Sequence, residues 1–420
     1  MNSPHRRPMS RSATSPGRAT TRRLPTTLAA LALLLGVALG GPGPLPAQEA
    51  GDAPKEVPLR VLRTTPLIDG HNDLPWAIRE REEAPMSVPA YDLESRAPGQ
   101  TDIERLRAGG VGGQFWSVYV PVDAVAEGAA RFQLEEIDIA LQIIERYPEH
   151  FALATTAADV ERIFHEGRIA SLLGMEGGHA IENSLGALRA FYALGVRYMT
   201  LTHSANIDWA DAGTDDELHG GLTEFGREVV REMNRMGMLV DLSHTSVNTM
   251  HDALDVAEAP VIFSHSSARA LTDHVRNVPD DVLRRLPENG GVVMVTFVPS
   301  FINEANRTWD GPVAQRPRAT IGDVADHIEH VRAVAGLDHV GIGSDFDGIT
   351  STPVGLEDVS TYPALLAELS RRGWTESELR KLVGENVLRA MRDAESAARR
   401  LQRERDPSTR TIQELDGIVS

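Results

Sequence analysis

Eight short apolar runs, separated by segments of helical character, constrain the fold of this chain more than any other feature. They occupy residues 66–73, 112–121, 169–176, 196–203, 237–244, 260–265, 291–299 and 339–345. Each run has the length and β-branched content of a strand that is buried on both faces. Between the runs, segments such as 131–147, 185–195 and 321–336 repeat apolar residues at intervals of three and four, as amphipathic helices do.

This alternation predicts an α/β fold, a (β/α)8 barrel of the TIM type, with additional C-terminal helices over 362–372 and 374–403. A doubly wound open sheet is the alternative fold. It is less favoured because polar residues of catalytic type close six of the runs, whereas an open sheet concentrates them at one crevice. We expect residues 48–403 to form a single domain and residues 404–420 to be a polar tail that frays.

The first 47 residues have the composition of an export signal. They contain six arginines and no acidic residue, then an apolar run over 28–39 and a Gly/Pro-rich stretch. The apolar run is shorter than the about 20 residues needed to span a bilayer. We therefore expect a signal peptide over 1–47, an exported periplasmic or extracellular protein, and no stable membrane anchor. The pair Arg22 and Arg23 is compatible with twin-arginine export.

Charge and cysteine content exclude several classes of function. The net charge is −18, and the export signal contains only basic charges, so the remainder of the chain is more acidic still. Such a domain repels nucleic acid and anionic lipid surfaces, and we expect no nucleic-acid partner. The absence of cysteine from the sequence excludes disulfides, thiolate metal ligands and a cysteine nucleophile.

Five residues with metal-binding side chains lie at or just beyond the ends of these runs. They are His71, Asp73, Glu176, His244 and His265. The carboxyl ends of parallel strands gather on one face of a barrel, so residues far apart in sequence can meet there. Imidazole nitrogen and carboxylate oxygen without sulfur suit zinc, with manganese, cobalt or iron as lesser options.

Five ligands exceed the three that one catalytic zinc normally takes from a protein. Two ions that share Glu176 fit the set better, and together they would hold a bridging hydroxide as the nucleophile. A proton carrier is then needed, and Asp345 closes the eighth run. Asp347, two residues further on, competes for this role.

Long stretches of the sequence resemble the membrane dipeptidase family, also called renal dipeptidases. The motifs are GHNDLPW (70–76), GMEGGHAIENSLGALRAFYALGVRYMTLTHSANIDWAD (174–211), GLTEFGREVVREMNRMGMLVDLSHTS (221–246), APVIFSHSSARA (259–270), RNVPDDVL (276–283) and GSDFDGI (343–349). The resemblance covers residues from about Pro66 to about Met391. It implies a zinc peptidase of the metal-dependent hydrolases, on a (β/α)8 barrel, that hydrolyses dipeptides.

The resemblance also implies a role for each ligand. It places one zinc ion on His71, Asp73 and Glu176. A second zinc ion lies on Glu176, His244 and His265, so that Glu176 bridges the two.

Three further residues take substrate roles by the same resemblance. His203 would polarise the scissile carbonyl, Arg276 would bind the terminal carboxylate of the substrate, and Trp76 would form a wall of the pocket. One position departs from the family, because Phe301 stands where the family has a tyrosine that helps to hold that carboxylate. The acidic loop 206–221 either roofs the site or forms a solvated surface turn.

The sequence thus predicts an exported dizinc dipeptidase, with a dipeptide as substrate and, by resemblance, a homodimer. Two other functions stay open: a related amidase or lactonase acting on N-acyl amino acids or lactones, and a non-catalytic binding protein of the same fold.

Overall fold

The computed structural model describes residues 56–418, and the export signal predicted over 1–47 lies outside these residues. The strands are β1 (Leu67–Asn72), β2 (Val111–Tyr119), β3 (Phe151–Leu153), β4 (Ile169–Glu176), β5 (Val196–Thr200), β6 (Leu239–Asp241), β7 (Val261–Phe263), β8 (Val292–Val295) and β9 (Val340–Ile342). The α-helices are α1 (Glu56–Thr64), α2 (Leu74–Arg79), α3 (Val88–Tyr91), α4 (Ile103–Ala108), α5 (Ala129–Arg146), α6 (Ala157–His165), α7 (Leu185–Ala193), α8 (Glu224–Met236), α9 (Val247–Val256), α10 (Asp280–Leu283), α11 (Leu286–Asn289), α12 (Pro299–Ile302), α13 (Glu304–Arg307), α14 (Ile321–Ala335), α15 (Tyr362–Arg371), α16 (Glu376–Arg380), α17 (Asn386–Glu404) and α18 (Ile412–Asp416). Within the described residues, no helix is both long enough and apolar enough to cross a bilayer.

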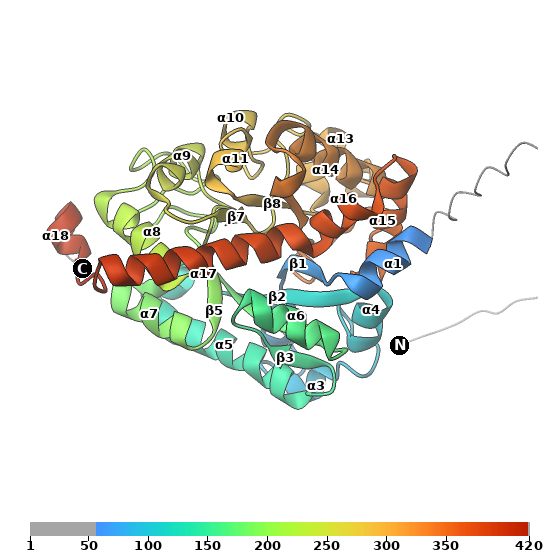
Figure 1. Cartoon of the computed structure of the whole chain (residues 1–420), viewed down its shortest axis with the longest axis horizontal. Coiled ribbons are helices and arrows are strands. Elements are labelled where there is room, and N and C mark those ends of the chain that lie inside the picture. The colour runs from blue at the N-terminus through green and yellow to red at the C-terminus, as the bar shows by residue number, and fades with distance from the viewer. Residues whose placement is uncertain (1–55, 419–420) are drawn as a thin grey trace, which may run out of the picture. The chain divides into compact units, whose positions relative to one another are not determined.

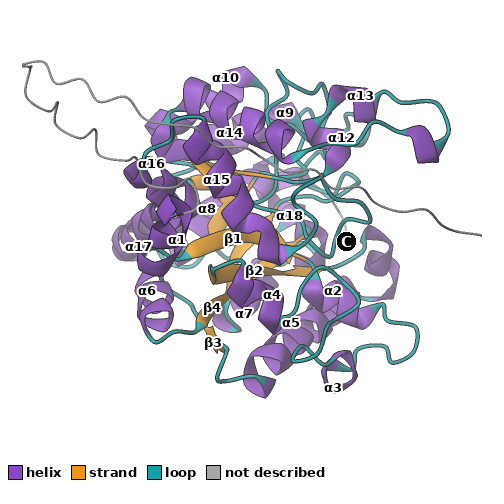
Figure 2. Cartoon of the chain, turned by 90° about the vertical axis from the view of Figure 1, so that its right-hand side faces the viewer, coloured by secondary structure: helices purple, strands orange, loops and turns teal. Residues whose placement is uncertain are grey.

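Eight parallel strands close into a barrel. The hydrogen-bonded order runs from β2 through β1, β9, β8, β7, β6 and β5 to β4, and a further pairing of β2 with β4 closes the ring. The strands form the inner layer and the helices surround them (Figure 2). The predicted (β/α)8 barrel is confirmed, and each of the eight predicted runs overlaps one of these strands.

The ninth strand, β3, was not predicted. It has only three residues and pairs with the first half of β4, where Phe151, Ala152 and Leu153 lie opposite Ile169, Ala170 and Ser171. The second half of β4 pairs with β5 instead. A segment of three residues is too short to show a period of two, so the sequence carried no usable signal for it.

The core joins the strands to the C-terminal helices. A cluster of buried apolar side chains includes Ile68, Phe115, Leu172, Tyr198 and Ile262, and it extends to residues of α6 and α17. Figure 1 shows α17 as the long red helix that crosses the strands, and it packs against α8, β8 and β9. The predicted C-terminal helices are therefore present and cover the barrel.

The last described helix, α18, packs against the start of α8. Ile412 in α18 is buried, and the carboxylate of Asp416 accepts hydrogen bonds from Thr223 Oγ1 at 2.6 Å and from the backbone N–H of Phe225 at 3.3 Å. These bonds satisfy donors at the start of α8 that lack partners within the helix. Within the polar tail expected over 404–420, one apolar residue and one capping carboxylate thus pack α18 against the rest of the fold.

Gly174 in β4 provides the space for a buried tyrosine. A Cβ atom at this position would lie 2.0 Å from Cζ of Tyr198 on the neighbouring strand β5. The Tyr198 hydroxyl lies 2.8 Å from Nδ1 of His71 and donates to the carbonyl of Gly70 at 3.2 Å. The missing side chain at residue 174 thus allows a contact between β5 and the end of β1.

We expect Gly174→Ala to lower the free energy of unfolding by about 1–3 kcal/mol, the usual cost of overpacking a core. Urea denaturation of the metal-free protein measures this. Gly186→Ala in α7 is the matched control, because its Cβ would meet only Ser184 Oγ, at 3.4 Å, and alanine favours a helix over glycine. Equal urea midpoints for the two variants would contradict the packing argument.

Candidate metal centre

The structure brings the predicted site residues together at the carboxyl ends of the strands. His71 is in β1 and Asp73 follows it, while Glu176 is the last residue of β4. His203, His244, His265 and Asp345 follow β5, β6, β7 and β9 respectively. Parallel strands end on the same face of a barrel, which explains how residues up to 274 positions apart converge.

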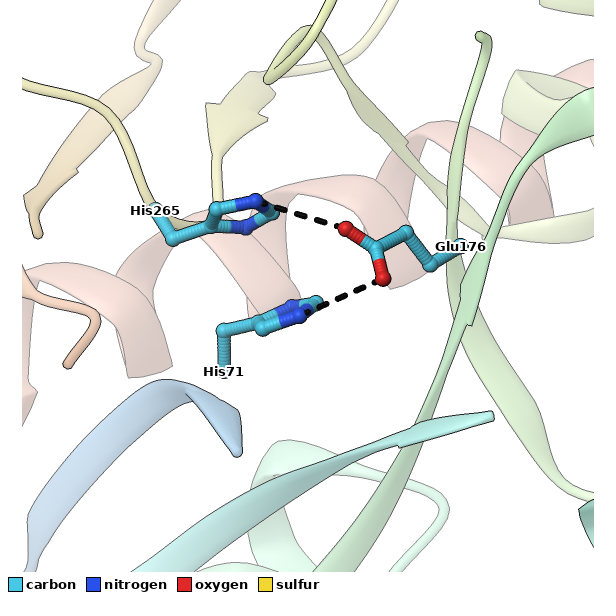
Figure 3. Close-up of side chains that lie close together, drawn as sticks. All are labelled: His71, Glu176 and His265. Carbon is cyan, nitrogen blue, oxygen red and sulfur yellow. Dashed lines mark ion pairs between the residues drawn. The ribbon is translucent and has the colours of Figure 1, made fainter. Parts of the chain in front are cut away.

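Glu176 lies at the middle of the cluster. Its Oε1 atom is 3.0 Å from Nε2 of His244 and 3.4 Å from Nε2 of His265, while its Oε2 atom is 3.5 Å from Nε2 of His71. Figure 3 shows the two carboxylate oxygens pointing separately toward His265 and His71. The Oδ2 atom of Asp73 lies 3.3 Å from the same Nε2 atom of His71. The carboxylate therefore has one oxygen available to each side of the cluster.

Two of the histidines are held through the ring nitrogen that faces away from Glu176. Nδ1 of His71 lies 2.8 Å from the Tyr198 hydroxyl, and Nδ1 of His265 lies 2.8 Å from Ser264 Oγ. Ser264 Oγ in turn donates to the buried carboxylate of Asp241 at 2.6 Å. Such partners fix the tautomer of a ligating histidine and leave Nε2 with a free lone pair. Nδ1 of His244 has no hydrogen-bond partner among the described residues.

Burial and neighbouring groups together shift the pKa values of these histidines. Burial, together with the nearby charges of Arg276 and His203, holds the pKa of His244 well below its usual range. Burial and the neighbouring His71 do the same for His265. Burial alone would lower the pKa of His71, but Tyr198, Asp73 and Glu176 outweigh it and raise that pKa well above the usual range.

The donor set fits a metal ion. Nε2 of His244 and Nε2 of His265 face each other at 2.9 Å, and neutral imidazoles in such a position need a proton or a cation between them. Three groups of candidate ligands can be drawn: His71, Glu176 and His265; Glu176, His203 and His244; and His71, Asp73 and Asp345. All are nitrogen and carboxylate oxygen donors, which zinc accepts. The second and third groups bring His203 and Asp345 within ligating distance as well.

A cavity of about 370 Å³ opens above these residues. Its lining consists of Asp73, Trp76, Tyr119, Glu176, His203, His244, His265, Arg276, Val298, Phe301, Asp345, Gly348 and Ile349. Eight of the nine predicted site residues are in this lining, and His71 lies directly behind Asp73. A cavity of this volume is in the range of small-molecule sites.

Aromatic rings form one wall of the cavity. The ring centroid of Tyr119 lies 4.9 Å from that of Trp76 and 4.6 Å from that of His203. His203 is also 4.3 Å from the ring of His244, and its Nε2 is 3.9 Å from Oε1 of Glu176. Burial lowers the pKa of His203, which favours its neutral form.

Arg276 supplies the guanidinium of the cavity and has no second Lys or Arg beside it in the described lining. It is buried, and its two hydrogen bonds, to Ser266 Oγ and to the carbonyl of His265, are both long at 3.5 Å. The Phe301 ring lies 5.4 Å from its Cζ atom. Burial lowers the pKa of Arg276 to about 10, so the side chain stays charged at neutral pH and has donors to offer an anion.

The structure separates Asp345 from its competitor Asp347. Asp345 lines the cavity and its Oδ1 atom lies 4.0 Å from Nε2 of His71. Asp347 does not line the cavity, and its Oδ1 atom accepts a hydrogen bond from the backbone N–H of Gln100 at 2.6 Å. The Gln100 side chain accepts from the N–H of Asp347 and donates to the carbonyl of Ile349. Asp347 is thus part of the clamp that holds this loop.

Sequence reasoning missed several residues of the site. Tyr119 is the last residue of β2. No site residue had been assigned to this predicted strand, so the position of Tyr119 at a strand end was the available signal. Tyr198 and Ser264 had no such signal, because their importance comes from contacts across the barrel. The acidic loop 206–221 contributes no residue to the lining of the cavity. It therefore does not roof the site, which was one of its two expected roles.

Comparison with known proteins agrees with this geometry. The membrane dipeptidase family, peptidase family M19, matches residues 57–405. The chain belongs to the membrane dipeptidase family. It is therefore a metallo-dipeptidase by class, and the predicted family resemblance is confirmed.

Three solved structures are similar to the chain. The probable dipeptidase PvdM from Pseudomonas aeruginosa has a TM-score of 0.74 at 23% identity, covering 82% of this chain and 99% of its own. A metallopeptidase from Rhodobacter sphaeroides, bound to a phosphinate mimic of the dipeptide L-Ala-D-Ala, has a TM-score of 0.70 at 29% identity. The match covers 79% of this chain and 99% of that protein. A dipeptidase of family M19, named dipeptidase AC, has a TM-score of 0.70 at 30% identity. The match covers 79% of this chain and 99% of that protein.

Proposed function

We propose that this chain is an exported dipeptidase that uses two zinc ions bridged by Glu176. The observation that carries the proposal is the division of the Glu176 oxygens between two groups of ligands. Oε2 faces His71, which lies beside Asp73, and Oε1 faces His244 and His265. Bound divalent ions supply Lewis acidity, which lowers the pKa of a water molecule and polarises a carbonyl group.

The cavity residues orient a dipeptide. Arg276 binds the terminal carboxylate, because a guanidinium matches a carboxylate with two parallel hydrogen bonds. Phe301 covers one face of that guanidinium and excludes water from it. Trp76 and Tyr119 form the apolar wall beside His203. The mimic of L-Ala-D-Ala bound to the Rhodobacter sphaeroides enzyme supports a dipeptide of small residues as substrate.

Two side chains handle the charge and the protons of the reaction. His203 is neutral, and its Nε2 atom faces the Glu176 side of the cavity, where an N–H can donate to the scissile carbonyl oxygen. The Asp345 carboxylate accepts a proton from the attacking water and delivers it to the leaving nitrogen. Asp345 is placed for this role, because it lines the cavity and its Oδ1 atom lies 4.0 Å from Nε2 of His71.

Export and assembly complete the proposal. The basic and then apolar composition of residues 1–47 supports a signal peptide, with export to the periplasm or the exterior and no stable membrane anchor. Family resemblance supports a homodimer.

A related amidase or lactonase is the second candidate for the function. The buried guanidinium of Arg276 in the cavity favours substrates with a free carboxylate instead.

Substrate preference tests the assignment of Arg276. We expect free dipeptides to be hydrolysed well and their C-terminal amides poorly. Arg276→Ala should raise KM for free dipeptides by roughly 10- to 100-fold, because a hydrogen bond to a charged group contributes about 1.5–3 kcal/mol. Steady-state kinetics on paired free and amidated dipeptides measure both effects.

Arg284→Ala is the control for loss of one positive charge, since Arg284 is exposed directly after α10 and pairs with Asp280. It should leave KM unchanged. Equal turnover of free and amidated dipeptides by the wild-type protein would overturn the assignment of Arg276, and faster turnover of N-acyl amino acids or lactones would favour the second candidate.

Proton transfer by Asp345 gives a separate prediction. Asp345→Asn should retain both metal ions and bind substrate while kcat falls by about 100- to 10,000-fold, the usual contribution of general acid–base catalysis. Metal analysis and kinetics on the same preparation distinguish the two effects. Asp347→Asn should matter far less, because its Oδ1 atom can still accept from Gln100. Near-normal kcat in Asp345→Asn, or a loss that follows loss of metal, would require another proton carrier.

A further inference from the structure

His244 differs from the other two histidines of the centre in how it is held. His71 and His265 are each fixed by a hydrogen bond to Nδ1, whereas Nδ1 of His244 has none among the described residues. The backbone of His244 is left-handed, with φ of +69°. Such a conformation costs a non-glycine residue about 1–2 kcal/mol, and it persists only where neighbouring structure enforces it.

The acidic loop 206–221 provides that enforcement. The N–H of Gly213 donates to the carbonyl of His244 at 2.7 Å. Ala212 forms an antiparallel bridge with Thr245, and the N–H of Ser246 donates to the carbonyl of Asp211 at 2.9 Å. The loop therefore pairs with the three residues 244–246, which connect β6 to α9.

Asp211 closes the loop on itself. Its carboxylate is buried and accepts from the backbone N–H groups of four consecutive residues, 218–221, at 2.8–3.3 Å. Its own carbonyl accepts from Thr249 Oγ1 of α9 at 2.9 Å. One residue thus joins the middle of the loop to its last four residues and also attaches the loop to the segment that carries His244.

We propose that loop 206–221, closed by Asp211, is the positioning element for His244 and sets the affinity of the metal position that His244 shares with Glu176 and His265. This inference rests on the proposed binuclear centre. Asp211 acts through the backbone and is a positioning residue. The position on His71 and Asp73 does not depend on this loop, because His71 is held by Tyr198 and β1.

The consequence is a selective loss of one metal ion. In Asp211→Asn, an amide N–H₂ replaces one acceptor oxygen and faces backbone donors, so the closure of the loop is weakened at nearly constant volume. Residues that orient a metal ligand typically contribute 10- to 100-fold to metal affinity. We expect this loss at the His244 position, and an affinity within about two-fold of wild type at the other.

The test is a Zn²⁺ competition titration of the metal-free protein against a chromophoric chelator, for the wild type and for Asp211→Asn. Asp216→Asn is the matched control, because it removes the same charge from the same loop at an exposed residue. Two binding steps in the wild type, with one step shifted in Asp211→Asn while the other is unchanged, and neither shifted in Asp216→Asn, support the proposal. Equal shifts of both steps, or none, overturn it.

A milder variant protects the test against misfolding. Thr249→Val removes only the hydroxyl that donates to the Asp211 carbonyl, so it should weaken the same step by roughly 2- to 10-fold. Hydrogen exchange at the Gly213 amide should be faster in both variants, because the bond to His244 opens more often. Saturation of the wild-type protein at one Zn²⁺ per chain would instead overturn the binuclear centre itself, and this inference with it.

Discussion

The buried carboxylate of Glu176 is the group on which the arrangement of the site depends. It ends a strand that pairs with β2 on one side and with β5 on the other, so the barrel determines its position closely. Transferring a charged group from water into a protein interior costs several kcal/mol unless opposite charge compensates it. His71 provides part of this compensation, and the nitrogen and oxygen atoms around it leave room for cations to provide the remainder. The barrel thus concentrates negative charge where a dipeptidase needs metal ions.

The centre is supported in two physically different ways. His71, Glu176 and His265 depend on strands and on side-chain hydrogen bonds that cross the barrel, to Tyr198 and Ser264. His244 and Asp345 instead have left-handed backbones, with φ of +69° and +68°. Their conformations depend on neighbouring segments, the loop closed by Asp211 and the clamp formed by Gln100. Side chains on loops of this kind can be adjusted without disturbing the barrel.

Much of the fold and the identities of the candidate site residues could be predicted from the sequence. Buried parallel strands are continuous apolar runs, and a polar residue at the end of such a run has few roles other than function. Hydrophobic periodicity therefore located eight strands and, with them, residues such as Glu176 and His265. Family resemblance added Arg276 and Trp76, which follow no periodic pattern.

The remainder depends on contacts between residues distant in sequence. Gly174 and Tyr198 are ordinary strand residues until the two strands pair, and Gln100 is 247 positions from Asp347. The strand β3 was too short to be recognised, and the docking of α18 rests on a single buried isoleucine and one carboxylate. The choice between Asp345 and Asp347 required the turn between them, because the spacing alone places both near the end of β9.

The central claim is that Glu176 bridges two metal ions, and anomalous diffraction tests it most directly. Crystals of the zinc-loaded protein would be measured on both sides of the zinc absorption edge. The account predicts two anomalous peaks, one among His71, Asp73 and Glu176 and the other among Glu176, His244 and His265. A single peak at full occupancy in catalytically active crystals would contradict it.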